Sequence, residues 1–88
     1  MAIQHRGPPN NWSQQRQHLY RKMQHLSQTD LIENIIKWQY KIITDRAMTD
    51  VARGMLQQQL GVVRHILEYD CGLDPELAIR DYIDMFYA

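Results

Sequence analysis

Apolar residues recur with the period of an α-helix over two adjacent segments in the middle of the chain, residues 31–43 and 52–67. One side of the first segment carries apolar residues at intervals of three or four: Leu31, Ile35, Trp38 and Ile42. Spacing of this kind places side chains on one face of a helix. The two segments offer almost no polar position that chemistry could use, so the pattern predicts a compact all-α domain and makes an active site within it unexpected.

Polar residues around these segments predict where the first two helices begin. The first helix starts near Ser13 and has a narrow apolar stripe, so we expect it to pack at the edge of the core. That stripe consists of Trp12, Leu19, Met23 and Leu26. The second helix covers about residues 30–46, with Ser27 or Thr29 as its N-cap. A second apolar stripe beside the first predicts that this helix contacts neighbours on two sides; it consists of Ile32, Ile36, Tyr40 and Ile43.

The third helix is expected over about residues 50–70, with Thr49 as its N-cap. A turn over residues 44–50 would make it antiparallel to the second helix, and a continuous helix through this segment is the alternative. The residues expected to face inward are Ala52, Met55, Leu56, Leu60, Val62, Val63, Ile66 and Leu67. Of the whole chain, Ile35, Trp38, Leu60 and Val63 are expected to be the most deeply buried.

A fourth helix follows a strong stop and start signal. Gly72 suits the left-handed position after a helix, and Asp74 before Pro75 is typical of a helix start. The residues that we expect this helix to bury are Ala78, Ile79, Tyr82, Ile83 and Phe86. The sequence thus predicts a small antiparallel three- or four-helix bundle, formed by a single domain over residues 12–88.

Residues 1–11 show no periodicity and contain Gly7, Pro8 and Pro9. Prolines lack a backbone donor and have a fixed φ, so we expect a flexible, extended N-terminal arm. This arm and the first helix are basic: residues 1–29 carry a net charge of +4, whereas residues 65–88 carry −5, although the whole chain is neutral. The two ends could attract each other, or they could form a basic arm for a polyanion and an acidic face for a basic partner.

Several classes of protein are not expected. The single cysteine, Cys71, cannot form an internal disulfide, and no apolar run approaches the roughly 20 residues that span a bilayer. His18 and His25 lie two helical turns apart, about 10 Å along the axis, which is too far to share an ion. We therefore expect a soluble, cytoplasmic protein without metal or cofactor, and not an enzyme.

Nucleic-acid binding is the alternative function. The basic arm and first helix carry Arg6, Arg16, Arg21 and Lys22, interleaved with Trp12 and Tyr20. Cations can bind phosphates while aromatic rings stack on bases. Four cations without a recognisable DNA-binding motif make this hypothesis the weaker one.

Small residues spaced by seven are the most unusual feature of the third helix. Ala47, Gly54 and Gly61 fall on one side, with His65 on the same side. A glycine inside an exposed helix costs up to about 1 kcal/mol relative to alanine. We therefore expect another helix to approach closely there, the alternative being a tolerated substitution on a solvated face. Trp12 and Tyr87 are further candidate anchors for a partner.

These features predict a small non-enzymatic module that binds a larger protein and modulates it, for example as an inhibitor. The partner could be a second copy or a larger complex. Accessory proteins of phages and other mobile elements are one class that fits this size. An enzyme subunit completed across an interface is a third hypothesis.

Overall fold

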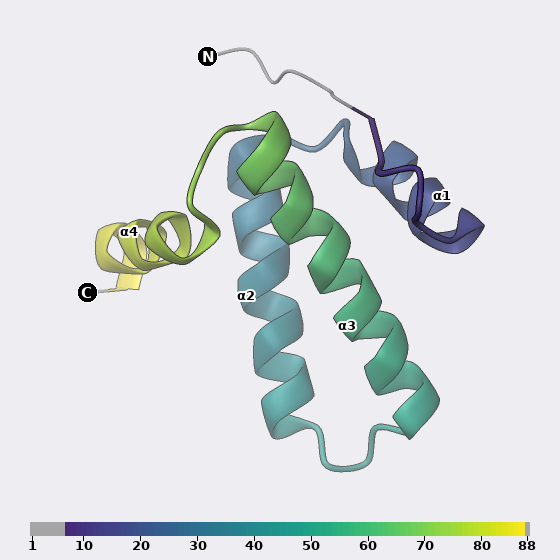
Figure 1. Ribbon diagram of the computed structural model, residues 1–88. Coiled ribbons are helices and arrows are strands. Elements are labelled where there is room, and N and C mark those ends of the chain that lie inside the picture. The colour runs from purple at the N-terminus through teal and green to yellow at the C-terminus, as the bar shows by residue number, and fades with distance from the viewer. Residues whose placement is uncertain (1–6, 88) are drawn as a thin grey trace.

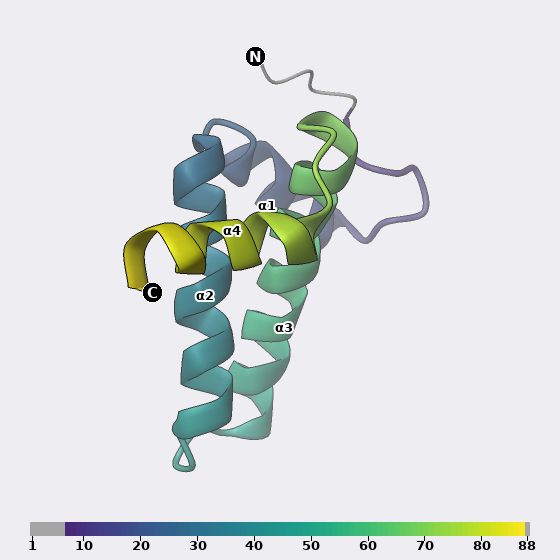
Figure 2. The same cartoon turned by 90° about the vertical axis from the view of Figure 1, so that its left-hand side faces the viewer.

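The computed structural model describes residues 7–87, apart from the side chain of Tyr87, and within that range contains four α-helices and no strand. The helices are α1 (Gln14–Met23), α2 (Gln28–Thr44), α3 (Asp50–His65) and α4 (Pro75–Tyr87); α3 continues into a π-helical turn, η1 (Ile66–Asp70). α2 and α3 form an antiparallel hairpin, α1 lies beside α3, and α4 crosses α2 (Figures 1 and 2). The predicted all-α helical bundle is confirmed, with α4 lying across the hairpin.

Each helix begins at a short polar side chain that the sequence predicts. These caps are Ser13, Ser27, Thr49 and Asp74. Each accepts a hydrogen bond from the backbone N–H three residues further on, at 3.1–3.5 Å. Such bonds satisfy donors that have no partner inside the helix. Of the two candidates for α2, Ser27 is the cap.

A turn, and not a continuous helix, joins α2 to α3. α2 ends at Thr44, two residues before the predicted end, and Asp45 has an extended backbone. The Asp45 carboxylate accepts the Ala47 N–H at 3.1 Å, which stabilises the turn locally. From α3, Arg53 donates to the Ile42 carbonyl at 2.8 Å and so satisfies an acceptor near the end of α2.

The third helix reaches residue 70 as predicted, but its last turn is the π-helical η1. Gly72 follows with a positive φ of 70°, which confirms its predicted left-handed conformation. The N–H of Leu73 then bonds to the Leu67 carbonyl at 2.9 Å. This reversal redirects the chain so that α4 crosses α2.

The core lies at one end of the hairpin, where α1 and α4 both pack. Its buried apolar residues are Tyr20, Met23, Leu31, Ile32, Ile35, Leu60, Val62, Val63, Ile66, Leu67 and Ile79. The predicted burial of Ile35, Leu60 and Val63 is confirmed. The predicted deep burial of Trp38 is wrong. This residue is only half-buried, because it lies closer to the turn than Ile35, the last buried residue of α2.

The half of the hairpin near the turn at residues 45–49 is not covered by another helix (Figure 1). Ala52 and Met55, which we expected to face inward, are exposed there, and so are Tyr40 and Ile43 of the second α2 stripe. The Cα atoms span 37 × 37 × 17 Å, so the molecule is a flat slab. In such a shape each helix has fewer neighbours than in a closed bundle.

Candidate binding surface

An open groove lies where α4 crosses α2. It has a volume of about 640 Å³ and is lined by Glu33, Ile36, Lys37, Tyr40, Tyr82 and Ile83. On α2 the second apolar stripe is buried at Ile32, half-buried at Ile36 and exposed at Tyr40 and Ile43. Burial decreases along this stripe because α4 crosses α2 and does not follow it (Figure 2).

Two contacts hold Tyr82 as one wall of the groove. Its hydroxyl donates to the Glu33 carboxylate at 2.5 Å. Its ring packs on Phe86 with centroids 4.6 Å apart and planes tilted by 40°. The groove therefore has an aromatic wall on α4, with the charged side chains of Glu33 and Lys37 on α2.

Large hydrophobic side chains are exposed in the groove lining, at Tyr40, and beyond it, at Ile43 and Phe86. Ile43 is 78% exposed, Tyr40 69% and Phe86 61%. Together with Ile83, these residues are called the α2–α4 apolar face below. The prediction that Ile83 and Phe86 are buried is wrong, because the C-terminal end of α4 extends past α2 (Figure 2).

A smaller exposed strip lies on α3. Val51 is 75% exposed, and Met55 is also exposed. Met55 follows Val51 by four residues and precedes the buried Val62 by seven, so all three side chains lie on the same side of α3. α1 packs on α3 near His65 and does not reach this strip, which has no aromatic wall comparable with that of the groove.

The predicted small-residue stripe is only partly assembled. Ala47 lies in the turn before α3, so it is not on the helix with Gly54 and Gly61. Both glycines are exposed, and a Cβ at either would meet no heavy atom within 4 Å. Nothing in the described chain approaches them closely, so a contact with another molecule at this stripe stays a prediction.

His65 and Trp12 pack within the molecule. Their ring centroids are 4.7 Å apart, and the Tyr69 ring also packs on His65, with centroids 4.5 Å apart. Burial lowers the pKa of His65, while the carboxylates of Asp70 and Glu68 act in the opposite direction. Both residues are half-buried, and their contact joins the segment just before α1 to α3. The side chain of Tyr87 lies outside the described residues.

Tyr20 and Asp70 form a buried polar contact that sequence reasoning missed. The Tyr20 hydroxyl donates to the Asp70 carboxylate and accepts the Gly7 N–H at 3.0 Å. Burial and the neighbouring carboxylate raise the pKa of Tyr20 to about 12. Asp70 follows Val63 and Ile66 by seven and four residues, so the helical period placed it on the inward face. That spacing is the signal that could have identified it.

The cations of the nucleic-acid hypothesis do not form one patch on α1. Arg16, Arg21 and Lys22 are all exposed. At 100° per residue, these positions are separated by 100° or more around the helix axis. Arg6 lies outside the described residues. The described part of the predicted arm, residues 7–11, has no helix and contacts the domain through Gly7.

Groups able to perform chemistry are sparse in the described range. No cluster of three or more metal-ligating side chains occurs within residues 7–87. Cys71 is a half-buried free thiol whose pKa is raised by burial, which disfavours the nucleophilic thiolate. Over the same residues, no helix combines the length and the apolar character needed to cross a bilayer.

Comparisons of the chain with protein-family models, with curated proteins and with solved structures find no match. The candidate surface therefore stands on the geometry and chemistry of the chain itself.

Proposed function

We propose that the protein is a small, non-enzymatic protein-binding module that holds an apolar segment of a partner on the α2–α4 apolar face and thereby modulates that partner. One observation carries the proposal: large hydrophobic side chains next to the groove remain mostly exposed, namely Tyr40 in its lining, Ile43 about one helical turn after Tyr40, and Phe86 in contact with the lining residue Tyr82. Contiguous exposed apolar surface on a soluble domain is typical of an interaction site.

The face is presented on a defined scaffold. Tyr40 and Ile43 lie in the last two turns of α2. The hydrogen bond that Arg53 donates to the Ile42 carbonyl stabilises this end of the helix. Phe86 is oriented by its contact with Tyr82, which Glu33 holds in turn. A surface that is ordered before binding loses less conformational entropy when a partner docks.

The nucleic-acid alternative gains no support from a specific observation. Binding along a phosphate backbone favours cations aligned on one side of an element, whereas Arg16, Arg21 and Lys22 are distributed around α1.

A matched pair of variants tests the proposed function. Ile43→Asp places a charge on the face, and Val51→Asp places the same charge on an equally exposed aliphatic residue elsewhere on the hairpin. Each purified variant is used as bait in an extract of the native host, with nuclease treatment and quantitative mass spectrometry.

We expect the parent and Val51→Asp to retain the same protein partner and Ile43→Asp to lose it. Equal capture by all three baits would contradict the proposal. Capture that disappears after nuclease treatment would support the nucleic-acid alternative instead.

A further inference from the structure

We infer that residues 7–12 form a proton-sensitive strap, which lies on the domain while His65 is neutral and is released when the imidazole takes up a proton. The inference does not depend on the proposed function or on the α2–α4 apolar face. It rests on a cluster of rings where the strap meets α1, α3 and η1, formed by Trp12, Tyr20, His65 and Tyr69.

The strap is attached to the domain at both of its ends. At the first end, the Gly7 N–H donates to the Tyr20 hydroxyl at 3.0 Å. At the second, the Trp12 ring packs with its centroid 4.7 Å from that of His65 and 6.4 Å from that of Tyr20. Between the ends, the Trp12 N–H donates to the Pro9 carbonyl at 3.1 Å and closes a turn. Both attachments converge on the ring cluster, so a change in the cluster affects the whole strap.

The His65 imidazole lies at the centre of this cluster. Its centroid is 4.5 Å from that of Tyr69 and 6.4 Å from that of Tyr20, in addition to the Trp12 contact. Tyrosine hydroxyls are uncharged near neutral pH, and no hydrogen bond to the imidazole is found within residues 7–87. Rings that surround an imidazole in this way keep water from it and disfavour its charged form.

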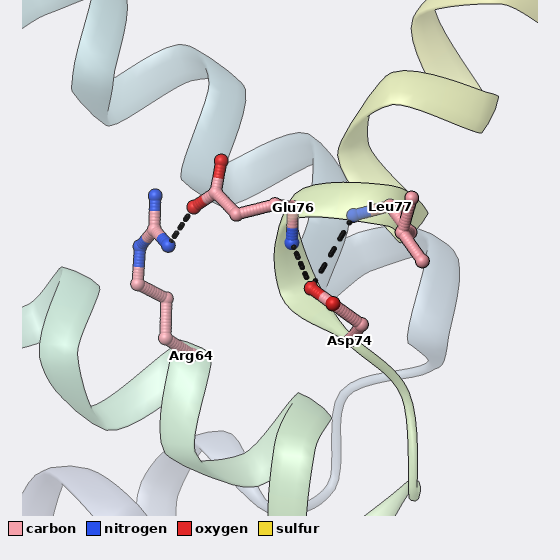
Figure 3. Close-up of polar contacts among 4 residues, drawn as sticks. All are labelled: Arg64, Asp74, Glu76 and Leu77. Carbon is pink, nitrogen blue, oxygen red and sulfur yellow. Dashed lines mark hydrogen bonds and ion pairs between the residues drawn. The ribbon is translucent and has the colours of Figure 1, made fainter.

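The charged groups near the imidazole belong to the domain and not to the strap. The carboxylates of Glu68 and Asp70 in η1 favour a proton on the ring. Arg64, the preceding residue of α3, forms an ion pair with Glu76 of α4 (Figure 3). Residues 7–12 are glycine, proline, asparagine and tryptophan, so the strap brings no charged side chain. The strap therefore adds desolvation to the imidazole without a compensating charge.

Release of the strap changes this balance. The Trp12 ring leaves with the strap and water reaches the imidazole, whereas the two carboxylates stay beside it. The released state therefore binds the proton more tightly, and by linkage the proton favours release. Burial lowers the pKa of His65 from its usual 6.5 in the docked state. Docking is thus fully favoured above pH 6.5 and weakens as the pH falls below that value.

Fluorescence of Trp12 gives the first test. Trp38→Phe leaves Trp12 as the single tryptophan of the full chain, and emission is recorded from pH 8 to pH 5, where histidines titrate. We expect the emission maximum to move to longer wavelength below pH 6.5, because the released ring enters water, with an unchanged far-UV circular dichroism spectrum. His65→Gln in this background should abolish the shift. His18→Gln, at an exposed position of α1, is the matched control and should retain it.

The reciprocal measurement follows proton binding itself. An NMR titration of the His65 Cε1–H resonance, assigned through the backbone, gives the pKa in the parent and in Trp12→Ala. We expect Trp12→Ala to raise the pKa of His65, because the imidazole becomes hydrated while the carboxylates remain. Asn11→Ala, at an exposed position of the strap, should leave it unchanged. This measurement does not require His65→Gln to fold.

Several results would overturn the inference. If the emission maximum stays constant, or moves equally in His65→Gln, a proton on this ring does not release the strap. A shift that accompanies loss of the helical circular dichroism signal means that the whole domain unfolds. Quenching of Trp12 without a change of wavelength means that the imidazolium stays against the docked ring in a cation–π contact. A pKa of His65 that Trp12→Ala leaves unchanged means that the strap does not control its hydration.

Discussion

Among single residues, Tyr20 makes hydrogen bonds whose contribution to stability should depend on pH, so that contribution can be measured separately from the rest. Tyr20→Phe removes the hydroxyl bonds to Asp70 and Gly7 and should lower the free energy of unfolding by about 1–3 kcal/mol near neutral pH. The raised pKa means that the unfolded chain ionises Tyr20 near pH 10, whereas the folded protein does so near pH 12.

The stability that Tyr20 contributes is therefore fully present below pH 10 and decreases as the pH rises toward 12. In urea unfolding curves, the difference between parent and Tyr20→Phe should shrink over this interval. Tyr40→Phe, at an exposed position, is the control and should show no such change. A difference that is constant from pH 8 to 12 would contradict the prediction.

Two isoleucines on α2 differ only in their position relative to the core. Ile35 is fully buried and Ile43 is 78% exposed. Ile35→Ala should destabilise the domain by about 2–5 kcal/mol through lost contacts and a cavity, whereas Ile43→Ala should change stability by no more than about 0.5 kcal/mol. Chemical denaturation of both variants at a concentration where each is monomeric measures this, and similar losses would mean that the α2 faces are wrongly assigned.

At the level of elements, α3 contains two glycines at positions where no contact within the described residues requires glycine. A Cβ at Gly54 or Gly61 would meet open space, and the helical backbone suits alanine. Each glycine-to-alanine substitution should therefore stabilise the domain by up to about 1 kcal/mol. Gly72→Ala is the contrasting variant: it should destabilise, because its φ of 70° strains any residue with a side chain.

Leucine at the same α3 positions tests the stripe as a binding site. If a partner helix approaches Gly54 and Gly61 closely, Gly54→Leu and Gly61→Leu should block association while the domain stays folded. If the face is merely solvated, both variants should associate like the parent. The readout is the capture assay used for the α2–α4 apolar face together with sedimentation velocity, with melting curves as the folding control.

At the scale of the whole molecule, the flat shape makes stability and association interdependent. A core confined to one end of the hairpin gives a domain of this size a thin margin of stability, and burial of the α2–α4 apolar face by a partner would add to it. The melting temperature of the parent should therefore rise when the captured partner is added in excess. Val51→Asp should follow the parent and Ile43→Asp should respond less, and a melting temperature of the parent that the partner does not change would contradict the prediction.

Features that depend on local interactions could be predicted from the amino-acid sequence. The four N-caps, the turn before Thr49 and the left-handed Gly72 were predictable, because each depends on residues within a few positions along the chain. The inward face of α3 from Leu60 to Leu67 was also predictable, since the helical period fixes which side chains share a side.

How far burial extends along each apolar stripe depends on the packing of the helices and could not be predicted from the sequence. Ile32 and Ile43 belong to the same stripe, yet α4 crosses α2, so Ile32 is buried and Ile43 is left exposed. The crossing depends on the direction in which the chain leaves Gly72, and no local pattern encodes that angle. The pairing of Tyr20 with Asp70, fifty positions apart, and the groove at Tyr82 likewise arise from packing between distant elements, which the sequence of any one element does not contain.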